Sequence, residues 1–334
     1  MAYEVVCIGN AIVDLIANVG DGLITGNGLD KGGMMLVDAD ESARRRMLVP
    51  DVAMTSGGSA ANTAACLASL GSKVAFVGKV GNDALGSIFR EGMRDIGVDF
   101  LCEADHEGIP TANCLALVTP DGERTMSTYL GACVHLSPSD LPEKAIAEAK
   151  LVFIEGYLLD SPHSAAAVEE IFDIAIANGT TIAITLSDSR CVERNHAVFD
   201  RLTSHYECGI VIANEKEIRA LHKTDTTNEA LDAAAKYPAI SVVTLGAKGA
   251  AVVEAGVGDR IRAEPVDKVV DLVGAGDAFA AGFLHGYVNG EYPRDALAVG
   301  AKCASVVIQG QGARPSVKLF DAVYGKVKKE MVYA

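Results

Sequence analysis

Residues 271–283 read "DLVGAGDAFAAGF", a run of small residues that leads directly into an apolar helical pattern, which Gly290 ends. The stretch therefore predicts a loop that opens a helix packed against the core. The first turn of such a helix has backbone N–H groups without intrahelical partners, and the macrodipole adds partial positive charge there. An anion can approach these amides closely at Gly274, Ala275 and Gly276, which carry little or no side chain.

Asp277 is the unexpected residue of this stretch, because a carboxylate repels a phosphoryl group bound beside it. The arrangement makes sense where the carboxylate takes the proton of a hydroxyl that attacks the phosphoryl group. The alternative is an aspartate that only complements the positive end of the helix dipole after a flexible loop. The residues alone leave both interpretations open.

The composition predicts a globular protein that acts on small molecules. The chain has 334 residues, 49% apolar and 22% charged, which suits one large domain with or without a smaller appendage. Its formal net charge of -15 disfavours nucleic acid and anionic membranes as partners. Residues 52–72 are uncharged but too rich in Gly, Ser, Thr and Asn for a membrane span.

Two sequence features point to a cytoplasmic location. The eight cysteines form no C-x-x-C pair and have no histidine at zinc spacing, which predicts reduced and mostly buried thiols. No basic residue precedes Lys31, so the N-terminus does not resemble a signal peptide.

The strand-like runs predict an α/β fold with two β layers. Apolar runs such as "LVFIEG", "TTIAITL", "CGIVIAN" and "AISVVTLG" alternate with helical patterns, typical of a parallel sheet covered on both faces. "YEVVCIG" predicts a further buried strand, which "AIVDLIANV" extends after an interruption at Gly9 and Asn10. Residues 111–130 predict a hairpin with its turn at residues 120–122. The β-rich parts of the first 130 residues have too few helices to join the parallel sheet, so we expect a small layer over its carboxyl edge.

Two common phosphate-binding motifs are absent from the sequence. There is no G-x-x-x-x-G-K-[ST], which excludes a Walker-type loop, and no complete G-x-G-x-x-G. The interpretation of this chain as a dinucleotide-dependent dehydrogenase therefore loses its main support.

Two motifs near the N-terminus carry polar residues that suit ligand binding. Asp14 lies in an apolar run, where burying an unpaired carboxylate costs free energy, and sugar hydroxyls are suitable hydrogen-bond donors to it. The alternative is a strand aspartate that is solvated or salt-bridged to a Lys or Arg. "GGSAANTA" brings Gly57, Gly58 and Asn62 to a loop-to-helix junction that a ligand can approach, and simple helix capping by Ser59 is the alternative.

Two motifs later in the chain have strong structural explanations. Asn214 and Glu217 in "NEKE" form a capping box, which by itself accounts for the motif. Arg124 follows the predicted turn and is ordinarily a solvated arginine. If the hairpin closes over a site, however, Arg124 can bring a guanidinium to a transferred phosphoryl group.

In this order, "GNAIVDL", "GGSAANTA", "NEKE" and "DLVGAGDAFAAGF" resemble the motifs of the PfkB or ribokinase-like family of carbohydrate and nucleoside kinases, nearly from end to end. The resemblance implies a single three-layer α/β/α domain over residues 1–334 with a mainly parallel central sheet. It also implies a small β-sheet lid from segments at about 12–52 and 110–131. ATP and Mg2+ are the implied co-substrates, and a monovalent cation such as K+ is a further candidate.

Intermediate stretches such as "GKVGNDALGSIF", "IPTANCLALVT" and "FIEGYLLDSP" are most similar to family members that phosphorylate adenosine. The resemblance thus implies transfer of the γ-phosphoryl group of ATP to a nucleoside 5'-hydroxyl, with adenosine as the expected acceptor. A kinase for ribose, fructose or a sugar acid of the 2-keto-3-deoxygluconate type is the alternative enzyme. A nucleoside-binding sensor that kept the fold without the chemistry is the alternative from another class.

Carried over position by position, the resemblance assigns roles to individual residues. Asp277 is the base, Arg124 meets the phosphates, and the anion hole consists of the amides of Gly274, Ala275 and Gly276. The acceptor contacts are Asn10, Asp14, Gly57, Gly58, Ser59 and Asn62, with Leu36, Leu130 and Tyr157 around a base. ATP is expected at Asn214, Thr244, Gly246, Gly274 and Gly276, and Mg2+ at Asn214 and Glu217, largely through water.

Two departures from the family pattern limit what the resemblance implies. Leu272 follows Asp271 where the family usually has Thr or Ser, which puts a side-chain role there and monovalent-cation dependence in question. "EGYLL" replaces a more aromatic stretch in the expected base pocket, which leaves the acceptor open. We expect a monomer or a homodimer, and a dimer would use exposed lid edges.

Overall fold

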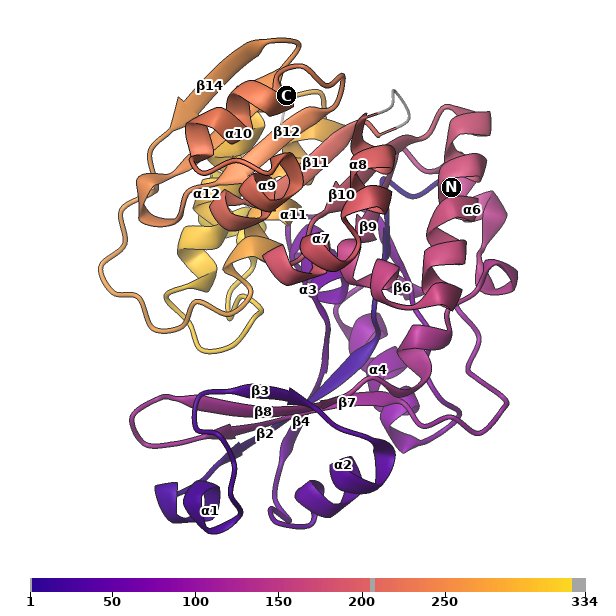
Figure 1. Ribbon diagram of the computed structural model, residues 1–334, viewed down its shortest axis with the longest axis vertical. Helices are drawn as coiled ribbons and strands as arrows, with labels where there is room; N and C mark the ends of the chain where they lie inside the picture. The colour runs from indigo at the N-terminus through magenta and orange to yellow at the C-terminus, as the bar shows by residue number, and fades with distance from the viewer. Residues whose placement is uncertain (1, 205–207, 326–334) are drawn as a thin grey trace, which may run out of the picture.

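The computed structural model describes residues 2–204 and 208–325. Its centre is a nine-stranded sheet, with a separate five-stranded sheet at one end of the molecule, at the bottom of Figure 1. The strands of the large sheet run parallel except for the last two of the chain, which are added antiparallel at one edge. In spatial order they are β14 (Val257–Ile261), β13 (Ala250–Glu254), β12 (Ile240–Thr244), β11 (Ile210–Asn214), β10 (Thr181–Thr185), β9 (Leu151–Glu155), β1 (Val5–Ile8), β5 (Val74–Val77) and β6 (Asp99–Phe100).

Helices cover both faces of the large sheet, because its strands are apolar on both sides. In β1, Val5 and Cys7 belong to one buried cluster and Val6 and Ile8 to the other. The predicted three-layer α/β/α arrangement is therefore confirmed. The first cluster includes α3 (Ser59–Ser69), α4 (Ala84–Asp95), α11 (Ala275–Val288), α12 (Pro293–Val307) and α13 (Leu319–Tyr324); the second includes α5 (Glu143–Glu148), α6 (Pro162–Asn178), α7 (Ser189–Arg194), α8 (His196–Ser204), α9 (Glu215–His222) and α10 (Thr227–Ala234).

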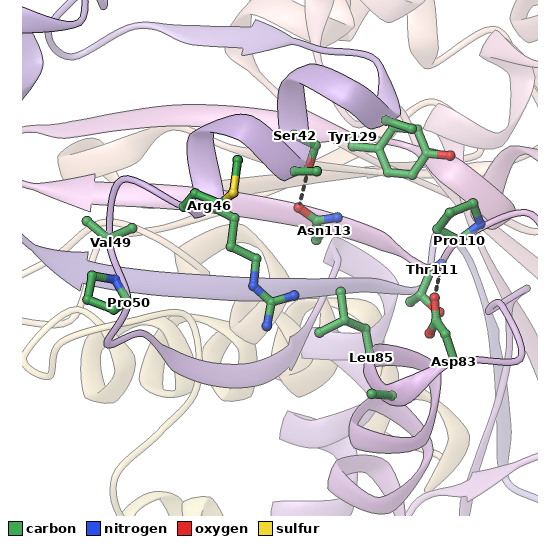
Figure 2. Close-up of a pocket in the computed structure, with 14 residues that line it drawn as sticks. Ser42, Arg46, Val49, Pro50, Asp83, Leu85, Pro110, Thr111, Asn113 and Tyr129 are labelled. Carbon is green, nitrogen blue, oxygen red and sulfur yellow. Dashed lines mark hydrogen bonds between the residues drawn. The ribbon is translucent and has the colours of Figure 1, made fainter.

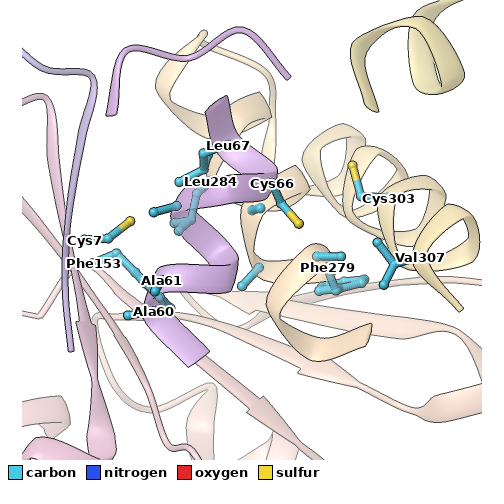
Figure 3. Packing of buried hydrophobic residues seen from close by; sticks show 14 of the residues in the cluster. Cys7, Ala60, Ala61, Cys66, Leu67, Phe153, Phe279, Leu284, Cys303 and Val307 are labelled. Carbon is cyan, nitrogen blue, oxygen red and sulfur yellow. The ribbon is translucent and has the colours of Figure 1, made fainter. Parts of the chain in front are cut away.

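Helix α3 packs between the large sheet and the pair formed by α11 and α12 (Figure 3). Its alanines lie against Cys7 and Phe153 of the sheet, and Cys66 lies on the side of Phe279. Small side chains on α3 let the three helices approach closely, so the N-terminal ends of α3 and α11 meet at the same place.

The second sheet, which we call the small sheet, has the strand order β3, β8, β7, β2, β4. The hairpin predicted over 111–130 is confirmed as the antiparallel pair β7 and β8. The expectation that the strand after Gly9 and Asn10 extends the first one is wrong: β2 pairs with β7 and β4, so the chain changes sheets at these two residues. The bounds are β2 (Ile12–Asn18), β3 (Met34–Leu36), β4 (Ala53–Gly57), β7 (Ala112–Val118) and β8 (Arg124–Tyr129), with α1 (Asp21–Gly26) and α2 (Ala39–Arg46) between strands.

The remaining expectations about the chain concern its cysteines and membrane insertion. All eight cysteines are free and seven of them are buried, as predicted. Burial raises the pKa of their thiols, to about 12 for Cys303, which disfavours the reactive thiolate form. In the part of the chain that the structure describes, no helix is long and apolar enough to cross a bilayer.

The close contact between α11 and α12 gives a test of this packing. A Cβ added at Gly282 would lie 2.7 Å from the Cα of Gly300, which is backbone and cannot move aside. We predict that Gly282→Ala lowers the free energy of unfolding by about 1–3 kcal/mol, measured by urea denaturation. Gly22→Ala is the matched control, because Gly22 lies in α1 with open space around its Cα, and this variant should be unchanged or slightly stabilised.

Candidate active site

The carboxyl ends of the parallel strands bring distant segments to one edge of the large sheet. Gly9 and Asn10 follow β1, Glu155 ends β9, and Asn214 and Thr244 end β11 and β12. The N-terminal ends of α3 and α11 reach the same edge, where Ser59 Oγ and Asp277 Oδ1 are 2.7 Å apart. Open α/β sheets bind ligands at such an edge.

The mouth of α11 has the backbone that its glycines predict. Gly274 precedes the helix with φ +77°, and a Cβ there would collide with the carbonyl oxygen of Ala313. Within the described residues, the amides of Gly274, Gly276 and Asp277 have no hydrogen-bond acceptor. The Ala275 amide differs from this expectation, because it donates to the Leu272 carbonyl at 3.2 Å. An anion at this turn would therefore meet three open amides and one engaged amide.

Asp277 is held by two side chains of α3. The Ser59 hydroxyl donates to Oδ1 at 2.7 Å, and Nδ2 of Asn62 donates to Oδ2 at 3.1 Å. The alternative in which Ser59 only caps α3 is wrong, because Gly58 is the N-cap and makes no side-chain cap bond. Burial raises the pKa of Asp277 to about 6, while the bonds from Ser59 and Asn62 lower it. The carboxylate is thus ionised at neutral pH and more basic than an ordinary aspartate.

Asp14 lies on the face of the small sheet that is turned toward Asp277. Strand register places Asp14, Cys114, Thr128 and Leu36 in one row across four strands. Among the described residues, the Asp14 carboxylate has no hydrogen-bond or ion-pair partner, so the salt-bridged alternative is wrong. Burial raises the pKa of Asp14 to about 6, and the charge of Asp277 adds to this rise. An unpartnered carboxylate in this position is suited to accept hydrogen bonds from hydroxyls.

Two glycines let the backbone pass close to Asp14 and Asn10. A Cβ at Gly57 would collide with the Asp14 carboxylate. Gly58 has φ +97°, and a Cβ there would collide with the Asn10 carbonyl oxygen. The structure therefore brings Asn10, Asp14, Gly57 and Gly58 together, as the sequence predicts for one binding region.

Glu155 is a buried carboxylate that the sequence analysis did not single out. It is 2% exposed, accepts from Nδ2 of Asn10 at 3.1 Å, and accepts from the amide of Ala60 at 3.0 Å. Burial raises the pKa of Glu155 to about 7, and the charge of Asp277 adds to this effect. Glu155 thereby caps α3 and fixes the point where the chain changes sheets.

Arg124 is held in an ion pair rather than left as a solvated hairpin arginine. Its Nη2 pairs with Oδ2 of Asp271 at 2.5 Å, and Asp271 also accepts from the amides of Val273 and Gly312. Arg124 is the register partner of Val118, which lies on the same face of β7 as Cys114, the register partner of Asp14. Arg124 and Asp14 therefore lie on the same face of the small sheet. The ion pair therefore joins the small sheet to the loop that opens α11. Leu272 is 69% exposed beside it.

The residues expected around ATP meet at the ends of β11 and β12. Asn214 and Thr244 are register partners, and Gly246 follows with φ +58° and open space around its Cα. The capping box is confirmed: Asn214 Oδ1 accepts from the Glu217 amide, and Glu217 Oε2 accepts from the Asn214 amide at 2.8 Å.

The same pair is the expected magnesium site. Glu217 is 5% exposed, burial raises its pKa to about 7, and both its oxygens are engaged with Asn214. The described residues contain no group of three or more His, Cys, Asp or Glu that would enclose a metal ion. Because both oxygens of Glu217 are engaged with Asn214, a magnesium ion at this pair would meet Glu217 through water rather than directly.

The expected base-pocket residues come from both sheets. Leu36, on the small sheet, is 60% exposed, and Leu130 follows β8. Tyr157 follows β9, and burial together with a hydrogen bond to Asp188 raises its pKa.

A cavity of about 610 Å3 lies on the face of the small sheet that is opposite to Asp14 (Figure 2). It is lined by α2, by the start of α4, and by the register partners Asn113 and Tyr129. None of the predicted site residues lines it, so its size does not mark the predicted site.

Arg314 is the second side chain of this region that the sequence analysis missed. Its Nε donates to Oδ1 of Asn62 at 3.1 Å, and its Nη1 donates to the Ser56 hydroxyl at 2.9 Å. Arg314 lies in an irregular segment after α12, so no helical or strand period pointed to it. Asp271, the partner of Arg124, was likewise not anticipated.

Comparison with known proteins identifies the class of this protein. The family model for pfkB family carbohydrate kinases matches residues 3–319, and the chain belongs to this family. It is therefore a phosphotransferase that acts on an alcohol group, and kinases of this family generally use ATP and Mg2+.

Three relatives show which members of the family this chain is similar to. The crystal structure of adenosine kinase from Sinorhizobium meliloti is 42% identical, with a TM-score of 0.88 over 97% of this chain and 99% of that one. An adenosine kinase from Schizophyllum commune is 28% identical over 93% of this chain and 96% of its own length. A 5-dehydro-2-deoxygluconokinase from Halalkalibacterium halodurans is 29% identical over 81% of this chain and 85% of its own.

The carboxyl groups of Asp14, Glu155 and Asp277 are expected to titrate as a coupled set. Because the charge of Asp277 raises the pKa of both Asp14 and Glu155, Asp277→Asn should lower both of these pKa values. Carboxyl 13C NMR titration of selectively labelled protein measures the change. Asp232→Asn, on the exposed side of α10, is the control and should leave them unaltered; unmoved values in Asp277→Asn would contradict the coupling.

Proposed function

We propose that this protein transfers the γ-phosphoryl group of ATP to the 5'-hydroxyl of a nucleoside, with adenosine as acceptor and AMP as product. The observation that carries the proposal is the relation of Asp14 to Asp277. Asp277 lies at an open helix mouth with its pKa raised to about 6, and Asp14 faces it without a partner among the described residues. The first suits proton transfer beside a phosphoryl group, and the second suits binding of a diol.

The proposed mechanism uses the two ends of this site in order. Asp14 accepts hydrogen bonds from the ribose hydroxyls, which places the 5'-hydroxyl near Asp277. The open amides at the mouth of α11 bind the oxygens of the γ-phosphoryl group. Asp277 then takes the hydroxyl proton while the new O–P bond forms and the bond between the γ-phosphorus and the leaving ADP oxygen breaks.

The other expected residues support these steps. Bound Mg2+ would supply positive charge to the phosphates, and Asn214 with Glu217 would orient its water shell. Thr244 and Gly246 would lie along the nucleotide. A role for a monovalent cation belongs to the same set of proposals. The Asp271 carboxylate near this loop already accepts from Arg124, Val273 and Gly312.

We propose that the small sheet acts as a lid, built from segments at about 12–52 and 110–131. Closure over the acceptor would exclude water that otherwise hydrolyses ATP. Arg124 would leave Asp271 and meet the phosphates, where a guanidinium stabilises the developing charge.

Two features favour adenosine over the alternatives. The face of the small sheet around Asp14 carries apolar residues such as Leu36, which suit a base. The 42% identical Sinorhizobium meliloti protein is an adenosine kinase. The similarity to a 5-dehydro-2-deoxygluconokinase supports a sugar-acid kinase as second candidate. A sugar acid needs a free cation, however, and the Nε and Nη1 of Arg314 are already engaged.

An ADP-release assay over adenosine, other nucleosides, ribose, fructose and sugar acids tests the acceptor. We predict that adenosine gives the highest kcat/KM, and that Asp277→Asn binds adenosine but loses at least about two orders of magnitude in turnover. Asp232→Asn is the control for the substitution itself. Near-normal turnover of Asp277→Asn would remove this residue from the mechanism.

The pH dependence follows from the raised pKa of the base. Asp277 must be ionised to accept a proton, and its pKa is raised to about 6, so activity is retained above that pH and lost as the pH falls through it. We predict that kcat/KM for adenosine falls at least about tenfold per pH unit well below pH 6. An acid limb centred near pH 4 would show that burial does not raise the pKa of the base.

A further inference from the structure

Arg314 has an unusual set of partners for an arginine close to acidic groups. Its Nε donates to Asn62 Oδ1, its Nη1 donates to Ser56 Oγ, and its Nη2 lies 3.8 Å from the Met93 sulfur. All three partners are neutral. No carboxylate of the described chain lies within ion-pair distance, although Asp14 and Asp277 both interact with its charge at longer range.

We propose that Arg314 is a positioning residue for Asp277: it fixes the amide of Asn62 so that Nδ2 points at the base, and it places a positive charge one side chain away. This inference rests on the proposed function, because it assigns Arg314 a part in presenting the proton acceptor.

The geometry of Asn62 carries the first half of the proposal. Its side-chain oxygen accepts from Arg314 and its nitrogen donates to Asp277 Oδ2, so the two bonds allow only one orientation of the amide. Asn62 is 7% exposed and is held by both partners. Without Arg314 the amide is free to turn, and Asp277 then loses a fixed donor.

The separation of the charges carries the second half. A guanidinium paired directly with Asp277 would hold its pKa far below neutrality and leave a poor base. Asn62 stands between them, so the positive charge acts from a greater distance. Burial still raises the pKa of Asp277 to about 6, while Arg314 limits that rise.

Arg314 also reaches the start of the site from the small-sheet side. Ser56 is 3% exposed and belongs to β4, which leads through Gly57 and Gly58 into α3. Through Ser56 and Asn62, Arg314 joins the two segments on either side of that turn. The charged and titratable groups around Asp277 are Asp14 from β2, Glu155 from β9, Cys66 from α3 and Arg314 itself.

The chain offers a closely matched control in Arg45 of α2. Arg45 is 8% exposed, its Nη1 donates to the Ser127 hydroxyl, and its Nη2 lies 3.6 Å from the Met35 sulfur. It therefore has the same kinds of neutral partner, plus Glu41, but belongs to the opposite face of the small sheet. Arg45→Met should cost stability without altering Asp277.

The first measurement needs no turnover. The carboxyl of Asp277 is titrated by 13C NMR in the full-length wild type, Arg314→Met, Arg314→Lys and Arg45→Met, with Asp277→Asn used for assignment. Arg314→Met should raise the midpoint by about one pH unit. Arg314→Lys should return it toward the wild-type value, because the charge is kept. A midpoint in Arg314→Met equal to that of the wild type overturns the electrostatic half.

The second measurement separates positioning from charge. At about pH 8.5 Asp277 is ionised in every variant, so a remaining loss of kcat reports the orientation of Asn62. Arg314→Met and Arg314→Lys should both lose about tenfold or more there, while Arg45→Met should not. Wild-type kcat at this pH in both Arg314 variants overturns the positioning half.

The test also covers a variant that does not fold and a wild type without activity. If Arg314→Met does not fold by circular dichroism, Arg314→Gln takes its place, since it keeps a donor for Asn62 without the charge. Its midpoint should rise as expected for Arg314→Met, and an unchanged midpoint overturns the electrostatic half. If the wild type phosphorylates no acceptor, the proposed function fails, while the NMR midpoints still decide whether Arg314 acts on Asp277.

Discussion

The site depends on one contact between helices that are far apart in sequence: the bonds from Ser59 and Asn62 of α3 to Asp277 of α11. Two helix N-termini converge there, and each brings partial positive charge toward the same carboxylate. Burial opposes this by disfavouring the ionised form. The outcome is a carboxylate that stays charged at neutral pH yet accepts a proton more readily than a solvent-exposed aspartate.

The negative charge of the carboxylates around this contact explains why uncharged groups serve as hydrogen-bond donors there. Asp14, Glu155 and Asp277 influence one another, and each has a pKa raised by burial. A substrate with a triphosphate would add more negative charge to a chain whose net charge is already -15. Open amides at α11 offset part of that repulsion without a counterion. Arg124, which the proposed mechanism moves to the phosphates, is held close to this loop by Asp271.

Local motifs are the part of the fold and site that the sequence could predict. The capping box at 214–217 and the loop before α11 are short segments whose geometry depends on neighbouring residues, and both form as expected. The parallel sheet also followed, because its strands are apolar on both faces. Helix α2 was not predicted, although Asp38 caps it by accepting from the Glu41 amide, which is a local sequence signal.

Partners separated by long stretches of chain could not be predicted. Arg124 and Asp271 are 147 residues apart, and Asn62 and Arg314 are 252 apart, so no spacing rule joins them. The prediction that the strand after β1 continues in the same sheet failed for the same reason. An apolar run fits a continued strand equally well, and only pairing with β7 and β4 decides where β2 lies.

One short segment, residues 312–314, connects the two ends of the site. The Gly312 amide donates to Asp271, the Ala313 carbonyl occupies the space that a Cβ at Gly274 would need, and Arg314 binds Asn62. The same three residues therefore support the loop that holds Arg124, the turn that opens α11, and the side chain that orients Asp277. A displacement of this segment would disturb the phosphate end and the acceptor end together. The alignment of a phosphoryl group with its acceptor thus depends on a stretch that contacts neither in the proposed mechanism.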